Sequence, residues 1–527
     1  MNFVANVPIS DSLAIRAAVA TDKRDPYFED GSEGIDNRAA RVRMLFAPAD
    51  DFDFIATLEY SEIDDTGVGF AYCPPNSDKP ACDGYPWRPY QGFGAPGTFG
   101  TPEGPRGENP NYLTRKNLGA YGELNYRLDR VTLTSITNWH KYDMSNRYVW
   151  DTVTDYRPIH KDEFITQEVR LASAPGSAIE WVSGLFYGNE RLDALEWFNF
   201  NGQPGIRLRV PDGSMDTKAL FGQMTVPVGD RFSFIGGVRR TYERKVMPGS
   251  STVFDSDGNP ITVQTGDTPL DEQRTTWNVG FRYDRNDDSM IYGKVANGFK
   301  SGGVNQVPAG LGLVEVYRPE EIVAVQIGSK NRFLGNRLQL NAEVFHYDYE
   351  DYQAITTVVD PTGFFPGSFF STINVQDATF YGGEVEMLYR LSDANQLDVY
   401  YTRLHGEFKG NPNQPGNAPD FTLGVAYEHW FDLAGGGEIR ARINSQYMPA
   451  HYTSNSNFAA SYRDSFTRTN ANVTYSPANA PWSLNFWVTN LEDEAVVRQG
   501  QTPTSRPGDN AFMMPPRFYG LTFNWNL

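Results

Sequence analysis

The stretch that decides the fold is WNVGFRYD, residues 277–284, in which two kinds of side chain alternate. Every second position is large and apolar or aromatic: Trp277, Val279, Phe281 and Tyr283. The intervening residues are polar or glycine. Because successive side chains of a β-strand point to opposite faces, this pattern predicts a strand with one apolar face and one polar face. Residues 338–344 and the final stretch, YGLTFNWNL at 519–527, repeat the pattern.

The connections between such stretches alternate in length along the 527-residue chain. About 21 strands are predicted. Short turns such as NDD near Asp287 and LGN near Gly335 are followed by long connections, of which 65–114 is the longest. PDGSMD at 211–216 with its flanks and residues 248–269 are two further expected loops. A transmembrane barrel has short turns on one side of the bilayer and long loops outside, whereas a β-sandwich or a propeller has no reason for this rhythm. The sequence therefore predicts an all-β fold, a transmembrane antiparallel β-barrel.

Composition and charge agree with this prediction. Aromatic residues make up 14 % of the chain, although hydrophobic residues reach only 40 %. No run approaches the roughly 18 apolar residues of a transmembrane helix, but a spanning strand needs only about 9–11 residues of alternating character. The 65 acidic and 46 basic residues leave a formal charge of −19, which argues against a nucleic-acid partner.

The expected strand directions make the barrel one strand short. The first strand, about 2–9, and the last, about 515–527, both run from the long-loop side to the short-turn side. Neighbours that close an antiparallel barrel run in opposite directions, so the strand number is even. We therefore expect about 21 of 22 strands, with the missing strand ahead of Met1. The strands at 131–150, 337–357 and 372–391 are long enough to extend the wall above the bilayer.

The two cysteines, Cys73 and Cys82, lie in one Pro/Gly-rich stretch of the 65–114 connection, which we expect to be extracellular. In an oxidising compartment they would form a disulfide, because two thiols without nearby histidines do not complete a zinc site. The same loop carries three aromatic residues that are candidates for ligand capture: Tyr85, Trp87 and Tyr90.

Five stretches together resemble the barrel of TonB-dependent receptors, which are outer-membrane transporters of Gram-negative bacteria. They are residues 6–25, TQEVRLAS at 166–173, KVANGFKSGGVN at 294–305, residues 317–353, and WVTNLEDEAV at 487–496. The resemblance implies location in the cell outer membrane and TonB-dependent uptake of a scarce nutrient such as a ferric siderophore. Vitamin B12-like cofactors, haem and oligosaccharides stay open as substrates. The alternatives are a passive pore without a plug and a non-functional truncated fragment.

Full-length members of that family carry a plug domain with a motif that binds TonB, and no stretch of this sequence matches either. We therefore expect residues 1–527 to be the barrel alone, with the plug and the first barrel strand missing. TonB would then act only through a plug that is not part of this chain. The other expected partners are outer-membrane lipid, the barrel assembly machinery and a small nutrient.

The C-terminus carries Gly520, Phe523 and Trp525 in the spacing of glycine, two residues, aromatic, one residue, aromatic. This resembles the signal read by the barrel assembly machinery, although such barrels often end in Phe and this chain ends in Leu527. An ordinary alternating last strand would show the same pattern.

No catalytic motif is present. The sequence has no G-x-S-x-G elbow and no H-E-x-x-H, and its six histidines are scattered, so we expect neither an enzyme nor a metal or cofactor. Two further motifs are interpreted as structural. Gly298, Gly302 and Gly303 are predicted to be turn residues, and Asn490 and Asp493 to close a turn.

Overall fold

The computed structural model describes residues 1–28, 31–69, 71–73, 111–149, 154–200, 203–254, 259–265, 269–305, 316–359, 368–501 and 509–526. These residues form β-strands and one short 3-10 helix, η1 (Ala459–Ser461). In this part of the chain no helix is both long and apolar enough to cross a bilayer.

One large antiparallel sheet dominates the fold. It contains 23 strands. Two of them, β12 and β13, form a hairpin beside β10, and the other 21 pair one after another along the chain in a continuous wall. This confirms the expected count. The wall strands are β1 (Asn2–Ser10), β2 (Leu13–Arg24), β3 (Ile35–Ala49), β4 (Phe52–Asp65), β6 (Tyr112–Arg127), β7 (Val131–Val149), β8 (Thr154–Ser173), β9 (Glu180–Phe200), β10 (Gln203–Val228), β11 (Phe232–Val246), β14 (Leu270–Asn286), β15 (Ser289–Lys300), β18 (Glu320–Phe333), β19 (Leu338–Val359), β20 (Ser368–Ser392), β21 (Asn395–Phe408), β22 (Phe421–Asp432), β23 (Glu438–Met448), β26 (Phe466–Ser476), β27 (Trp482–Thr489) and β30 (Phe518–Trp525).

Smaller pairings lie at the rim that carries the long connections, which we call the loop rim. The strands that form them are β5 (Ala71–Cys73), β12 (Gly249–Phe254), β13 (Pro260–Thr265), β16 (Gly303–Val304), β17 (Val316–Tyr317), β24 (His451–Tyr452), β25 (Tyr462–Arg463), β28 (Val497–Gln501) and β29 (Asp509–Met513). Two stretches that the sequence predicts to be long loops are therefore partly strands. Residues 248–269 contain the β12–β13 hairpin, which pairs with β10. The stretch PDGSMD lies within β10, because a bulge with Asp212 at a φ of 53° absorbs its irregular residues.

The two faces of the wall differ as the alternation predicts. The outer face carries an exposed apolar band that includes Leu185, Val279 and Ile327, which are 61 %, 57 % and 49 % exposed. Toward the loop rim the same face becomes polar, and Arg240 on β11 donates hydrogen bonds to Gln273 (2.6 Å) and Thr275 (2.9 Å) on β14. A band of apolar side chains bounded by polar ones is the surface that a bilayer requires of a spanning barrel. We call the opposite side of the wall the lumen face.

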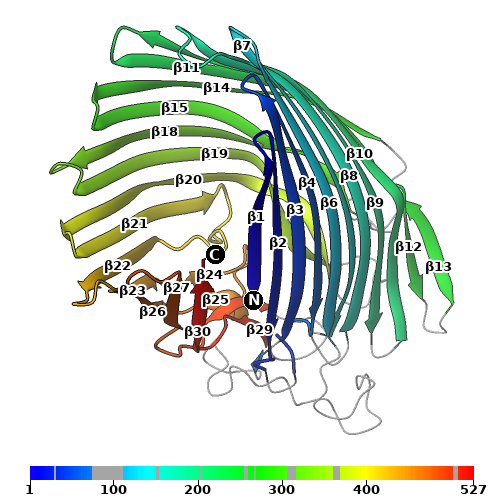
Figure 1. Cartoon of the computed structure of the whole chain (residues 1–527). Coiled ribbons are helices and arrows are strands. Elements are labelled where there is room, and N and C mark those ends of the chain that lie inside the picture. The colour runs from blue at the N-terminus through cyan, green and yellow to red at the C-terminus, as the bar shows by residue number, and fades with distance from the viewer. Residues whose placement is uncertain are drawn as a thin grey trace.

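Figure 1 shows the wall curling round so that β1 returns toward β30. Every step from β1 to β30 is antiparallel, so these two strands run in the same direction, and among the described residues no backbone pairing joins them. A closed antiparallel barrel needs an even strand number, so one further strand between β1 and β30 would complete it.

At the loop rim the two ends of the wall are in contact. The ring of Tyr27, just after β2, meets the ring of Phe518, at the start of β30, edge-on at 5.8 Å. The Arg24 guanidinium lies 5.1 Å from the first ring and 5.2 Å from the second. Beside them, β5 from the β4–β6 connection pairs with β29 from the β27–β30 connection. These contacts fasten one end of the wall to the other.

The same place holds a compact group of buried apolar side chains, made of Phe28, Val497, Ala511 and Met513, all at most 5 % exposed. We call these four residues, together with Arg24, Tyr27 and Phe518, the rim clasp.

Candidate functional site

Three aromatic rings stack on the lumen face at the loop-rim ends of β7, β8 and β9. Tyr148 and Tyr156 lie opposite each other in the β7–β8 register with ring centroids 6.1 Å apart. Phe198 follows on β9, and its ring is 4.4 Å from that of Tyr156. Burial raises the pKa of Tyr156, so its hydroxyl stays protonated over the physiological pH range. A row of neutral rings at a channel mouth can stack against planar groups of a ligand.

A polar group borders this stack. His160 on β8 and Glu196 on β9 approach to 3.2 Å, and this contact raises the pKa of the imidazole. The mouth therefore offers one charge-bearing pair beside three aromatic rings. We call Tyr148, Tyr156 and Phe198 the mouth stack.

The second feature is the connection between β15 and β18, which is tied down by the buried side chain of Gln353 on β19. Its amide nitrogen donates to the carbonyl oxygens of Ser301 (3.0 Å), Arg318 (3.0 Å) and Lys300 (3.5 Å). Gln353 is only 6 % exposed, so these carbonyls are satisfied away from bulk water. One side chain thus holds both ends of the connection.

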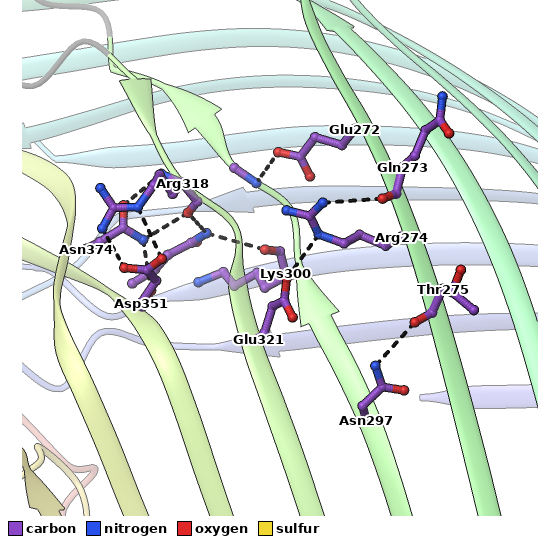
Figure 2. Close-up of polar contacts among 12 residues, drawn as sticks. Glu272, Gln273, Arg274, Thr275, Asn297, Lys300, Arg318, Glu321, Asp351 and Asn374 are labelled. Atoms are coloured by element: carbon purple, nitrogen blue, oxygen red, sulfur yellow. Dashed lines mark hydrogen bonds and ion pairs between the residues drawn. The ribbon is translucent and has the colours of Figure 1, made fainter.

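Figure 2 shows the polar contacts around this point, with Arg318, Asp351 and Asn374 gathered from three segments. The Arg318 guanidinium makes two hydrogen bonds to the Asp351 carboxylate, at 3.1 and 2.5 Å. The Asn374 amide donates to the carbonyls of Arg318 (2.9 Å) and Asp351 (2.8 Å), and its oxygen accepts from the Arg318 backbone N–H (2.7 Å). We call Gln353, Arg318, Asp351 and Asn374 the polar hub.

The hub extends to β14, where the Glu272 carboxylate accepts from the Gly302 N–H at 3.0 Å. Close packing explains the glycines here. A Cβ at Gly302 would lie 2.6 Å from the Tyr317 carbonyl oxygen, and one at Gly303 would overlap the Tyr317 ring. Gly298 lies inside β15 and Gly303 begins β16, so the prediction of a turn is wrong for these two residues. The motif's glycines therefore admit a tightly docked connection.

Asn490 and Asp493 close a turn, as predicted. Both have positive φ, of 52° and 58°. The fully buried Asn490 side chain donates to the Glu494 carbonyl (3.0 Å) and accepts from the Glu494 N–H (3.1 Å). Asp493 accepts from the Arg517 N–H at 2.9 Å, at the entry to β30.

The other predicted residues are only partly within the described structure. Cys82, Tyr85, Trp87, Tyr90 and Leu527 lie outside it. The backbone of Cys73 ends β5 and pairs with Asp509, and the disulfide stays a prediction.

In the last strand, Phe523 and Trp525 are 60 % and 54 % exposed on the outer face. A Cβ at Gly520 would come within 2.6 Å of the Trp487 ring, so this glycine makes room for that side chain. Recognition by the assembly machinery also stays a prediction. Among the described residues, no group of three His, Cys, Asp or Glu side chains is placed to hold a metal ion.

The mouth stack and Gln353 were not found by sequence reasoning. The aromatic content at the ends of the strands around 148–156 was a weak signal, because it does not say which rings meet. Gln353 stands in a run of tyrosines and acids that reads as ordinary strand, and its carbonyl partners lie 35 to 53 residues away in sequence.

Comparison with known proteins places this barrel among outer-membrane receptors. Residues 83–491 match the family model "TonB dependent receptor-like, beta-barrel". The pesticin receptor of Yersinia enterocolitica is 25 % identical over 287 residues, which are 54 % of this chain and 40 % of that protein. The chain thus spans less than half the length of this curated relative.

Two solved structures share the fold. The ferric yersiniabactin uptake receptor FyuA of Yersinia pestis superposes with a TM-score of 0.83 at 17 % identity, covering 99 % of this chain and 77 % of that one. The ferric-catecholate import receptor Fiu of E. coli K12, in its closed form, gives a TM-score of 0.71 at 15 % identity, covering 99 % and 79 %.

The fold and the two-faced wall, together with the family match, define a large outer-membrane β-barrel of a Gram-negative bacterium. The chain belongs to the TonB-dependent receptor-like β-barrel family. The family consists of receptors and transporters and not of enzymes, which agrees with the expectation from the sequence.

Proposed function

We propose that this chain forms the barrel of a receptor for TonB-dependent uptake of a ferric siderophore. The observation that carries the proposal is the mouth stack, which lines the lumen side of the loop rim in a barrel of this receptor family. Relatives named as receptors for ferric yersiniabactin and ferric catecholates support the choice of ligand class.

In this proposal the loop rim faces the outside medium. Long connections, above all residues 65–114 with Tyr85, Trp87 and Tyr90, capture the ligand, and a Cys73–Cys82 disulfide restrains that loop. The ligand then stacks on the aromatic rings at the mouth before it enters the lumen. The apolar band contacts lipid, the last strand presents Phe523 and Trp525 to the assembly machinery, and TonB supplies the energy.

Uptake of iron-55-labelled siderophores tests the proposal. A strain with the gene deleted, and the same strain complemented, are compared under iron limitation with a panel of catecholate, hydroxamate and mixed-ligand siderophores. We expect one class to depend on both the gene and TonB. Gene-dependent entry that persists without TonB would instead identify a passive pore, and uptake of every panel member without the gene would refute the receptor assignment.

A matched pair of variants tests the mouth stack. Tyr156→Ala removes the central ring, and we expect siderophore affinity to fall on the order of tenfold, since stacked aromatic contacts contribute about 1 kcal/mol beyond the area that they bury. Tyr187→Ala on β9 removes a ring that is 40 % exposed on the outer face and serves as the control. Equal effects of the two variants on affinity would contradict a ligand role for the stack.

A further inference from the structure

Three cations on the lumen face have no ion pair with a carboxylate among the residues that the structure describes. They are Arg239 on β11, Lys294 on β15 and Lys330 on β18, and we call them the cation strip. The alternation along each strand places these three cations on the lumen face. Val238, next to Arg239, is 55 % exposed on the outer face. Ile291 and Ile327, which precede Lys294 and Lys330 by three residues, are 40 % and 49 % exposed on the same outer face.

Arg239 and Lys330 lie against aromatic rings, and Arg239 also donates a hydrogen bond to the Thr241 hydroxyl at 3.2 Å. The Arg239 guanidinium lies 5.2 Å from the Phe186 ring and 5.7 Å from the Phe221 ring. The Lys330 ammonium lies 5.9 Å from the Tyr292 ring. Ring faces hold cations in place without neutralising their charge, so the positive potential of the strip persists.

The strip borders two adjoining hollows in the lumen wall. One has a volume of about 410 Å³ and is lined by Lys294 and Lys330, and the other has about 300 Å³ and is lined by Arg239 and Lys294. The side-chain amides of Gln223 and Asn278 line both hollows. Lys294 therefore stands between two spaces that are each large enough for a small organic anion.

Glycines create this space. A Cβ at Gly280, opposite Lys294 in the β14–β15 register, would lie 2.8 Å from the Gly293 carbonyl oxygen. A Cβ at Gly237 would lie 2.6 Å from the amide nitrogen of Asn278. The floor of the hollows is therefore bare backbone, which a ligand can approach closely.

Two acids on the adjoining strands, Asp284 and Glu343, have hydrogen-bond partners outside the strip. Asp284 accepts a hydrogen bond from Arg282 at 3.0 Å. Glu343 accepts from the Tyr292 hydroxyl at 2.6 Å and from the Gln326 amide at 3.1 Å. The strip thus combines charges of one sign that repel one another, and an anion placed between them would offset that repulsion.

We propose that the cation strip is a binding site for the carboxylate groups of a small anionic solute inside the lumen. Lys294 and Lys330 supply the charge, Arg239 extends the site toward the loop rim, and the amides of Gln223 and Asn278 complete the donor set. The inference goes beyond the proposed uptake function, because it concerns binding by the barrel wall and does not depend on which siderophore the mouth receives.

Citrate is the probe for the test. The purified full chain in nonionic detergent is titrated with citrate by isothermal titration calorimetry, at low salt and again at about 0.15 M salt, where screening weakens accessible ion pairs. We expect saturable binding that weakens with salt. We also expect K294Q/K330Q to lose affinity on the order of tenfold or more, because two charge-assisted contacts are removed.

The control is R240Q/R244Q, which removes the same number of charges from the outer face of β11. Circular dichroism first confirms that each variant keeps its strand content, and R239Q/K294Q replaces the first variant if that one fails to fold. The proposal is overturned if the wild-type chain does not bind citrate, or if the control weakens binding as much as the lumen variant does. The calorimetry measures no transport, so a negative result with citrate would overturn the binding site in the lumen but not the proposed uptake function.

Discussion

The loop rim is fastened in two places by opposite chemistry. The rim clasp joins the two ends of the wall through buried apolar side chains and an arginine between two rings. The polar hub fixes the β15–β18 connection through amides, carbonyls and one ion pair. The clasp can hold parts that are distant along the chain because apolar contact is tolerant of geometry, whereas the hub imposes one geometry on a connection between neighbouring strands.

The largest loss should come from the centre of the clasp. Phe28→Ala leaves a cavity among Val497, Ala511 and Met513, and we expect a local destabilisation of roughly 3–5 kcal/mol. Hydrogen exchange of the β28 and β29 amides measures it. Faster exchange confined to these strands, with the hub amides unchanged, is the expected result. Equal acceleration at both places would show that the clasp and the hub are one cooperative unit.

The second-largest loss of stability should come from Gln353→Leu in the polar hub. This change keeps the approximate volume of the side chain but removes the donor to three carbonyls. Buried carbonyls without a donor cost about 1–3 kcal/mol each, so a local loss of about 3 kcal/mol is expected. Exchange at residues 301–305 and 316–318 reports it. Gln339→Leu, at an exposed position on the same strand, is the control, and a similar response to both changes would argue against the hub.

Arg24→Met measures how much the charge of Arg24 contributes to the stability of the rim clasp. Methionine preserves much of the apolar stem, so the variant loses mainly the two cation–π contacts and the hydrogen bond to the Glu33 carbonyl. We expect a loss of about 1–2 kcal/mol. Urea unfolding in lipid vesicles measures it, and an effect as large as that of Phe28→Ala would mean that the clasp is not held mainly by apolar burial.

The smallest effect is expected at the exposed ion pair of the hub. The hydrogen bonds from Arg318 hold the pKa of Asp351 below its usual range, so the pair's contribution is present at neutral pH. That contribution is lost as pH falls through the lowered pKa of the folded state. The two side chains are 69 % and 40 % exposed, so Asp351→Asn should cost less than about 1 kcal/mol at pH 7.

The same variant should flatten the decline of hub stability below about pH 4, near the ordinary pKa of an aspartate. Hydrogen exchange at residues 316–318, corrected for the intrinsic pH dependence of exchange, follows this decline. An unchanged acid profile in Asp351→Asn would assign the pH dependence to another group.

Much of the wall was predictable because the alternation of apolar and polar side chains in each strand is visible in that strand's own sequence. The pattern from Trp277 to Tyr283 gave both the strand and its outward face, and the long strands predicted at 337–357 and 372–391 correspond to β19 and β20. Prediction from local sequence fails where pairing with a neighbouring strand overrides the preference of the residues for a loop. Residues 211–216 contain Pro, Asp and Gly and read as a loop, yet pairing with β9 carries β10 through them by means of a bulge.

The candidate site was much less predictable, because it depends on register between strands. Tyr156 meets Phe198 only because β8 and β9 pair in one particular register, and a shift of one residue would turn one of the rings to the outer face. The hub likewise joins β19, β20 and the β15–β18 connection, and the cation strip joins β11, β15 and β18. No short motif records which of these residues face each other.

The two-faced wall is the central claim, and spin-label accessibility along β14 tests it most directly. Single cysteines at positions 276–283, in a background with Cys73→Ser and Cys82→Ser, are labelled with a nitroxide in lipid vesicles. The account predicts that labels at odd positions, such as Val279, collide mainly with oxygen dissolved in the bilayer. Labels at even positions, such as Gly280, should collide mainly with a water-soluble nickel complex. Equal accessibility to both reagents along the whole stretch would contradict a membrane-spanning wall with a separate lumen face.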